Sequence, residues 1–280
     1  MNPCQKYFSV CLLALATQAA FAQSAPALGS AANFAVLSAA ANGGGAVTCT
    51  DSSVTGDVGS SGLPASIVQT NCTITGAVVA PVSAQVVMDF DLAYAALAAT
   101  PCDQVLTTLD GQMLSPGVYC FDAAATSTGS VLTLNGPSTG TWIFKIGTLG
   151  TGALTGTNFS VITPSGAAPA CNNVFWSVAE AVTMTDSKFV GTVLAGQAIT
   201  LTRGTFNGDA LAKAAVTLTG ATLIGCEAGV AKPPKKHCNQ GVGNGPENCD
   251  PGNSNQGNPF RSNDELGGTP GNPGRKGGNK

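Results

Sequence analysis

Histidine and basic residues are almost absent from most of this chain. Its single histidine, His237, lies after Gly229, and between Ser24 and Gly229 only four lysines and arginines face eleven acids. A Ser-His-Asp or Cys-His catalytic arrangement and a histidine-based zinc site are therefore excluded from that stretch. The acidic balance also argues against a nucleic-acid partner, because phosphate recognition needs clustered lysine and arginine.

Aromatic residues are scarce as well, at 6% of the chain. Trp142 and Trp176 lie in apolar strand-like segments, so we expect them to be buried rather than to form sugar-binding platforms. A glycosidase would need two carboxylates opposed across a cleft, and the candidates Asp57, Asp186 and Asp209 lie beside corner glycines, where exposed polar residues are expected anyway. No Walker loop or dinucleotide fingerprint is present. We therefore predict a protein without enzymatic activity that needs no cofactor and no metal.

The chain contains only one extended apolar run near a terminus, Val10 to Ala20. Lys6 precedes it, and the small-x-small triplet Ala20-Phe21-Ala22 follows before Gln23, as in a cleavable export signal. The run is too short to span a membrane. We predict a signal peptide at residues 1–22, a secreted mature protein and no membrane span.

Cysteine is plentiful by comparison. Cys4 and Cys11 fall in the predicted signal, which leaves eight cysteines in the exported chain. An even number in an exported protein favours disulfides, and no Cys-x-x-Cys pair suggests zinc. Eight cysteines allow 105 pairings. Our hypothesis follows local order: Cys49–Cys72, Cys102–Cys120, Cys171–Cys226 and Cys238–Cys249.

A seventeen-residue period dominates the second half of the chain. Three segments share an apolar-Thr-apolar-Thr pattern at that spacing: Val182–Thr185, Ile199–Thr202 and Val216–Thr219. Three further segments with the same period end in Gly191, Gly208 and Gly225. Two motifs with one period indicate a repeated structural unit, hence a stacked solenoid. Each unit holds three short strands, so we expect a triangular coil with glycines at corners.

Strand alternation predicts which side chains face outward. Ile199, Leu201 and Phe206 should point inward, whereas Thr200, Thr202 and Thr205 should point outward. The segment 83–99 breaks the strand pattern and predicts one helix, with Ser83 as a capping residue and Pro101 beyond its end. We assign the solenoid domain to residues 23–229. Residues 230–280 are rich in Gly, Asn and Pro, which is typical of a flexible tail.

A second pattern, Thr-x-x-(Thr/Ser/Asn)-apolar, recurs along the chain. It joins Thr155 to Asn158, Thr202 to Thr205, Thr219 to Thr222, Thr70 to Thr73 and Thr50 to Ser53. Thr185 keeps the first position, but Lys188 stands at the second. Stacked strands lie about 4.8 Å apart, close to repeat distances in ice, and threonine is a stiff side chain with a methyl and a hydroxyl. Threonine is also simply favoured on exposed strands, so the pattern alone leaves other binding partners open.

Several segments resemble the microbial ice-binding-protein-like family. They are Leu28–Leu37, Ser115–Phe121, Cys171–Trp176 and Gly191–Gly220, in the family's order. The resemblance implies a right-handed parallel β-solenoid of triangular section, dominated by β structure, with one long helix beside it. Family members that bind ice use a flat face, in some cases marked by Thr-(Ala/Gly)-x-(Thr/Asn). The stretch from Asn42 to Pro81 resembles the region of a capping loop.

These observations lead to a secreted ice-binding protein, expected to act as a monomer, that slows ice growth or recrystallisation. The predicted ice-contact residues are Thr155, Asn158, Thr185, Thr202, Thr205, Thr219, Thr222, Thr70, Thr73, Thr50 and Ser53. The alternative is a cell-surface or matrix adhesion module that holds a polymer on the same wall. A polysaccharide-active enzyme is the third hypothesis.

Overall fold

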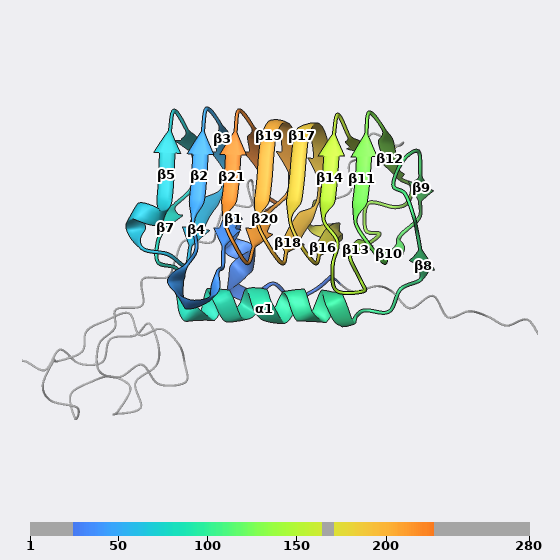
Figure 1. The fold of residues 1–280 in the computed structure, drawn as a ribbon, viewed down its shortest axis with the longest axis horizontal. Coiled ribbons are helices and arrows are strands. Elements are labelled where there is room, and N and C mark those ends of the chain that lie inside the picture. The colour runs from blue at the N-terminus through green and yellow to red at the C-terminus, as the bar shows by residue number, and fades with distance from the viewer. Residues whose placement is uncertain (1–24, 164–170, 227–280) are drawn as a thin grey trace, which may run out of the picture. The chain divides into compact units, whose positions relative to one another are not determined.

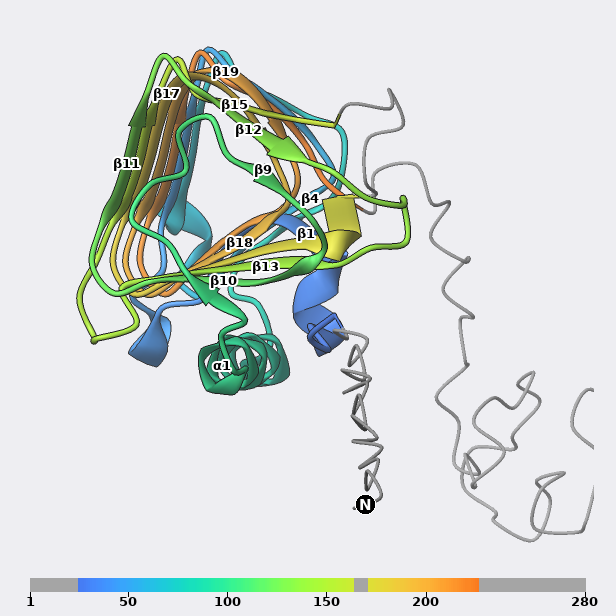
Figure 2. The ribbon, with the colours of Figure 1, turned by 90° about the vertical axis from the view of Figure 1, so that its right-hand side faces the viewer.

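The computed structural model describes residues 25–163 and 171–226. In this part of the chain, parallel strands wind into a solenoid with three walls (Figure 1). Seen along its axis, the solenoid is triangular, and the single α-helix of the described residues lies against one wall (Figure 2). The predicted fold class, a β-solenoid with one long helix alongside, is confirmed. No helix in these ranges is long and apolar enough to cross a membrane.

The first wall, which we call the threonine wall, is a ladder of parallel strands. The long strands β17 (Val182–Val190) and β19 (Ile199–Asn207) contribute their first halves to it. In spatial order the wall contains β5 (Ile67–Thr70), β2 (Val47–Thr50), β21 (Val216–Thr219), β19, β17, β14 (Leu154–Thr157) and β11 (Ala125–Thr128).

The second wall follows each strand of the first around a corner, and it includes the second halves of β19 and β17. In order it contains β6 (Thr73–Ile74), β3 (Ser53–Thr55), β22 (Thr222–Ile224), β19, β17, β15 (Ser160–Ile162), β12 (Val131–Leu134) and β9 (Met113–Leu114).

The third wall, the helix wall, is a nine-stranded sheet covered by α1 (Ala84–Ala99). Its strands, in order, are β7 (Val78–Val79), β4 (Asp57–Ser60), β1 (Phe34–Ser38), β20 (Ala210–Ala212), β18 (Thr192–Ala195), β16 (Val174–Val178), β13 (Trp142–Ile146), β10 (Gly117–Phe121) and β8 (Gln104–Val105). Four 3₁₀ segments complete the described elements: η1 (Gly29–Asn33), η2 (Ala41–Gly43), η3 (Pro64–Ser66) and η4 (Cys171–Asn173).

Strand alternation builds the interior as predicted. Ile199, Leu201 and Phe206 are buried, whereas Thr202 and Thr205 face outward. Inside the coil, aromatic rings stack from rung to rung, with Phe144 and Trp176 centroids 4.0 Å apart. Both tryptophans are buried, as expected, and each indole donates to a backbone carbonyl. The interior is thus filled by large side chains and leaves the walls as the exposed surfaces.

The chain does not stack its coils in sequence order. β2 pairs with β21 and β3 pairs with β22, which joins segments nearly 170 residues apart. α1 then carries the chain along the solenoid, so that later coils build up towards this seam (Figure 1). The expectation of a capping loop between Asn42 and Pro81 is wrong. This stretch forms β2 to β7, two further rungs of the solenoid, because its alternating Val and Thr residues suit stacked strands.

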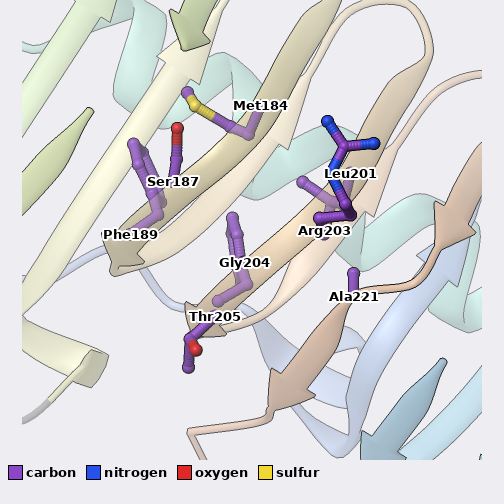
Figure 3. Close-up of a pocket in the computed structure, with 9 residues that line it drawn as sticks. Met184, Ser187, Phe189, Leu201, Arg203, Gly204, Thr205 and Ala221 are labelled. Carbon is purple, nitrogen blue, oxygen red and sulfur yellow. The ribbon is translucent and has the colours of Figure 1, made fainter. Parts of the chain in front are cut away.

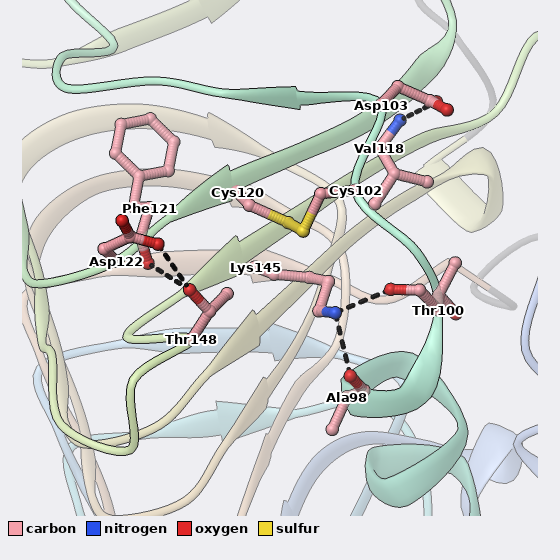
Figure 4. The surroundings of a disulfide bond; sticks show 10 residues. All are labelled: Ala98, Thr100, Cys102, Asp103, Val118, Cys120, Phe121, Asp122, Lys145 and Thr148. Atoms are coloured by element: carbon pink, nitrogen blue, oxygen red, sulfur yellow. Dashed lines mark hydrogen bonds between the residues drawn. A yellow bond between two sulfur atoms is a disulfide. The ribbon is translucent and has the colours of Figure 1, made fainter.

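The helix runs from Ala84 to Ala99, one residue shorter than predicted. Val86, Phe90, Ala93 and Leu97 form its buried stripe. Ser83 is the N-cap residue, as predicted, but its hydroxyl makes no capping hydrogen bond. At the other end, Lys145 Nζ donates to the carbonyls of Ala98 and Thr100 at 2.8 and 2.6 Å (Figure 4). A cation at the helix C-terminus satisfies carbonyls that lack intrahelical partners.

Three of the four predicted disulfides are present. Cys49 is joined to Cys72, Cys102 to Cys120 (Figure 4) and Cys171 to Cys226. The first links neighbouring rungs at one end of the threonine wall, and the second fastens the chain after α1 to the helix wall. Cys238–Cys249, the signal at residues 1–22 and the tail at residues 230–280 lie outside the described residues.

Candidate functional site

The threonine wall presents two continuous columns of outward side chains. Strand pairing places equivalent threonines of successive rungs beside one another along the whole wall. The first column is Thr126, Thr155, Thr183, Thr200, Thr217, Thr48 and Val68. The second column is Thr128, Thr157, Thr185, Thr202, Thr219, Thr50 and Thr70. Val68 on the end strand is thus the one outward position of these strands that is not threonine.

Both columns are regular because every rung turns in the same way at its end. The residue after the second threonine has positive φ on each rung, between 48° and 62°, and is Gly129, Asn158, Asp186, Arg203, Gly220, Asp51 or Asn71. Glycine, asparagine and aspartate tolerate this left-handed conformation, whereas arginine rarely adopts it. Arg203 is held there by a bidentate ion pair with Asp186, at 2.6 and 2.7 Å. These hydrogen bonds lower the pKa of Asp186.

This corner corrects the predicted register. The Thr-x-x-Thr pattern does not mark neighbours on one flat wall, because the left-handed residue between its two positions sends the chain around the corner. Thr202 therefore lies on the threonine wall and Thr205 on the second wall, as do Thr219 and Thr222. On the rung of Thr155 the left-handed corner residue is Asn158 itself. Thr157 therefore pairs with Thr185, and Thr155 pairs with Thr183.

The predicted site residues consequently separate into two groups. Thr155, Thr185, Thr202, Thr219, Thr50 and Thr70 lie on the threonine wall. Thr205, Thr222, Ser53 and Thr73 lie on the second wall. Lys188, which interrupted the predicted pattern, is also on the second wall, opposite Ser160 and Thr205. The threonine columns therefore contain no charged side chain.

In the first column the sequence pattern assigned a binding role to Thr155 alone, and in the second column it assigned that role to some of the threonines. The unassigned threonines are Thr48, Thr126, Thr128, Thr157, Thr183, Thr200 and Thr217. The signal that finds them is the Thr-x-Thr alternation, which appears in Thr126-Ser-Thr128 as plainly as in Thr200-Leu-Thr202. Alternation within one strand keeps both threonines on the same face.

A hollow of about 10 Å³ lies at the corner of the threonine wall near Gly204, between Arg203 and Thr205 (Figure 3). That is about the space of one water molecule, far below a ligand pocket. The carboxylates considered for catalysis all have partners: Asp186 binds Arg203, Asp57 accepts from Ala77 N–H, and Asp209 accepts from Thr192. A flat, uncharged, periodic wall suits an extended solid surface.

Comparison with known proteins agrees with this geometry. The model of the ice-binding-like family matches residues 28–224. The chain belongs to the ice-binding-like family. A curated ice-binding protein of Nostoc is 39% identical over 180 residues, covering 60% of this chain and 61% of that protein. One from Flavobacterium frigoris is 33% identical over 190 residues, covering 60% of this chain and 64% of the relative. The chain thus aligns with less than two thirds of the length of either relative.

A solved structure of the ice-binding-like family extends the likeness to the fold. The crystal structure of an ice-binding protein from the Antarctic ascomycete Antarctomyces psychrotrophicus superposes with a TM-score of 0.63 at 32% identity. The superposition covers 72% of this chain and 98% of the fungal protein. The resemblance seen in the sequence is therefore confirmed at the level of family and architecture.

Proposed function

We propose that this chain binds ice through its threonine wall and thereby inhibits ice growth or recrystallisation. The observation that carries the proposal is the pair of register-matched columns on a flat wall, with threonine at every position except the end residue Val68. Membership of the ice-binding-like family and relatives named as ice-binding proteins support it.

The spacing of the columns suits a crystalline partner. Hydroxyls repeat about every 4.8 Å along the solenoid and about 6.6 Å between the columns, from ordinary strand geometry. The threonine methyls order water, while the hydroxyls anchor it. Since χ1 of threonine is restricted by its β-branch, little rotamer freedom is lost on adsorption. The wall would therefore hold an array of water molecules that matches the lattice of ice.

The support beneath the wall keeps this array rigid. Each rung is hydrogen-bonded to the next, and the core stack includes Phe189 and Phe206, whose centroids lie 5.2 Å apart. The ion pair Asp186–Arg203, beside the columns, neutralises its own charges. We further propose a secreted, monomeric, non-catalytic protein, because the threonine columns carry no histidine, cysteine or carboxylate and the N-terminal residues read as an export signal.

Partition of the full chain into slowly growing ice tests the proposal, with Thr200→Lys as the variant. Thr200 lies mid-wall, and a flexible charge there should reduce adsorption by at least about tenfold, the effect of losing 1.4 kcal/mol. Thr133→Lys, on the second wall, is the matched control and should adsorb as the wild type does. Wild-type protein that stays in the liquid overturns the proposal. Retention on insoluble polysaccharide in place of ice would favour the adhesion module.

A further inference from the structure

The second wall is divided into two unlike halves. Towards the seam and the β6 end, one column consists of Thr205, Thr222, Ser53 and Thr73, all outward-facing and placed side by side by strand pairing. The column next to it includes Asn207, Ile224 and Thr55. No charged residue interrupts these positions. We call this half the corner array.

The opposite half of the same wall has a different character. Its outward positions include Lys188 and several large exposed apolar side chains, namely Met113, Val131 and Ile162. Ile224 in the corner array is exposed and apolar as well, so the difference between the halves is Lys188, whose long, flexible, charged side chain does not suit a flat, repeating surface. The break falls at Lys188, directly beside Thr205 on the neighbouring rung. The corner array therefore begins at Thr205, on the rung next to the charged Lys188.

The corner array is continuous with the threonine wall. Four rungs contribute to both surfaces. On the threonine wall they carry Thr202, Thr219, Thr50 and Thr70, and on the second wall they carry Thr205, Thr222, Ser53 and Thr73. Two residues separate the two positions on each rung, and the first of them is left-handed on all four rungs. Arg203 and Asp51 are the charged residues among these four corners: Arg203 is paired with Asp186, and Asp51 accepts a hydrogen bond from the side-chain amide of Asn71 at 2.7 Å.

Side-chain hydrogen bonds also join the two strands, β3 and β22, that meet at the seam within the corner array. Ser53 donates to the hydroxyl of Thr222 at 3.4 Å, and the buried Ser52 links the same two rungs by accepting from Ala221 N–H at 3.1 Å. The hydroxyls of the corner array are thus held at the strand spacing across segments that are remote in the sequence. A rigid, uncharged patch of this kind has the properties on which the proposed ice contact of the threonine wall depends.

We propose that the corner array is a second ice-contact surface, so that the chain adsorbs to ice planes of two orientations. The inference rests on the proposed function of the threonine wall. Two walls of a triangular solenoid meet at an angle and cannot lie flat on one crystal plane together. A molecule that presents both therefore recognises one plane through the threonine wall and a second plane through the corner array.

Adsorption of fluorescently labelled full chain to a hemisphere of single-crystal ice tests this inference. Wild type should label two sets of planes. Thr222→Tyr, at the centre of the corner array, should lose one set and keep the other, while Thr200→Tyr should show the converse. Thr133→Tyr, on the other half of the second wall, is the matched control and should keep both sets. Thr205→Tyr repeats the first test at a second exposed position, and thermal melting confirms that each variant is folded.

The outcomes separate the two proposals. If wild type labels one set of planes, or if Thr222→Tyr and Thr205→Tyr label the same planes as wild type, the corner array has no role and the inference falls. In that case loss of all labelling in Thr200→Tyr would still support the threonine wall. If wild type labels no plane, the proposed function itself is overturned.

Discussion

The threonine wall and the helix wall are both built of parallel strands, but their outward side chains differ. On the helix wall one outward column reads Cys120, Lys145, Ser177, Leu194, Leu211 and Leu37, each beside the next in register. On the threonine wall the columns repeat threonine at every position except the end residue Val68. The irregular column fits one unique partner, the helix, whereas the uniform columns fit a partner that is itself periodic. The difference shows that the solenoid is a scaffold on which the outward residues alone decide what each wall binds.

The largest effect is expected from a substitution that removes a side chain packed between α1 and the helix wall. Phe90 is fully buried between α1 and the helix wall, and Phe90→Ala should lower the free energy of unfolding by about 3–5 kcal/mol. Met88→Ala, on the exposed side of α1, should change it by no more than about 0.5 kcal/mol. Chemical denaturation measures both. Adsorption to ice per folded molecule should be unchanged in each variant. A parallel loss of adsorption in Phe90→Ala would show that the two walls are not independent.

Two disulfides, one at the threonine wall and one at the helix wall, allow the local stability of the two walls to be compared. The double variant Cys49→Ser/Cys72→Ser releases the end rung of the threonine wall and should cost about 2–4 kcal/mol of stability. Hydrogen exchange should rise most at the backbone amides of β5, the end strand. The matched double variant Cys102→Ser/Cys120→Ser opens a link at the helix wall and should leave β5 protected. Equal exchange of β5 in the two variants would contradict this assignment.

The smallest expected effect concerns pH. Hydrogen bonds from Arg203 lower the pKa of Asp186 beneath its ordinary value of 3.8. A carboxyl with a lowered pKa in the folded state stabilises the fold above its ordinary value and loses that contribution as pH falls through the folded value. Threonines do not titrate, so adsorption should stay constant from neutral pH down to 3.8.

Below that pH the corner beside Thr185 and Thr202 should loosen, and thermal melting should detect a small fall in stability. Asp186→Asn should melt with less dependence on acid than the wild type. An ice-adsorption profile with a midpoint near neutral pH would contradict the account, because no group of the threonine wall titrates there.

The sequence was sufficient to predict the repeat unit, the helix and the disulfide pairs in the described residues. The seventeen-residue period and the alternation of Ile199, Leu201 and their threonines carry that information locally. The register of the threonine wall was harder to predict, because it depends on which residue adopts a left-handed conformation at the corner. Arg203 gives no such signal, since arginine is disfavoured there and is held by an ion pair that only the fold reveals.

The seam is the other feature that local patterns could not show. Thr48 lies beside Thr217 only because α1 returns the chain along the solenoid. The sequence between them contains a helix, a change of direction and most of the other coils, so no short-range periodicity relates the two threonines. The continuity of the threonine columns is therefore a property of the tertiary fold.

Thermal hysteresis of three tyrosine variants would show whether the threonine wall is the main ice-contact surface. Thr200→Tyr places the bulky ring on the threonine wall, Thr133→Tyr on the second wall outside the corner array, and Met88→Tyr on the exposed side of α1. The account predicts that hysteresis falls several-fold in Thr200→Tyr and stays at the wild-type level in the other two. Wild-type hysteresis in Thr200→Tyr, with a loss in either of the others, would contradict it.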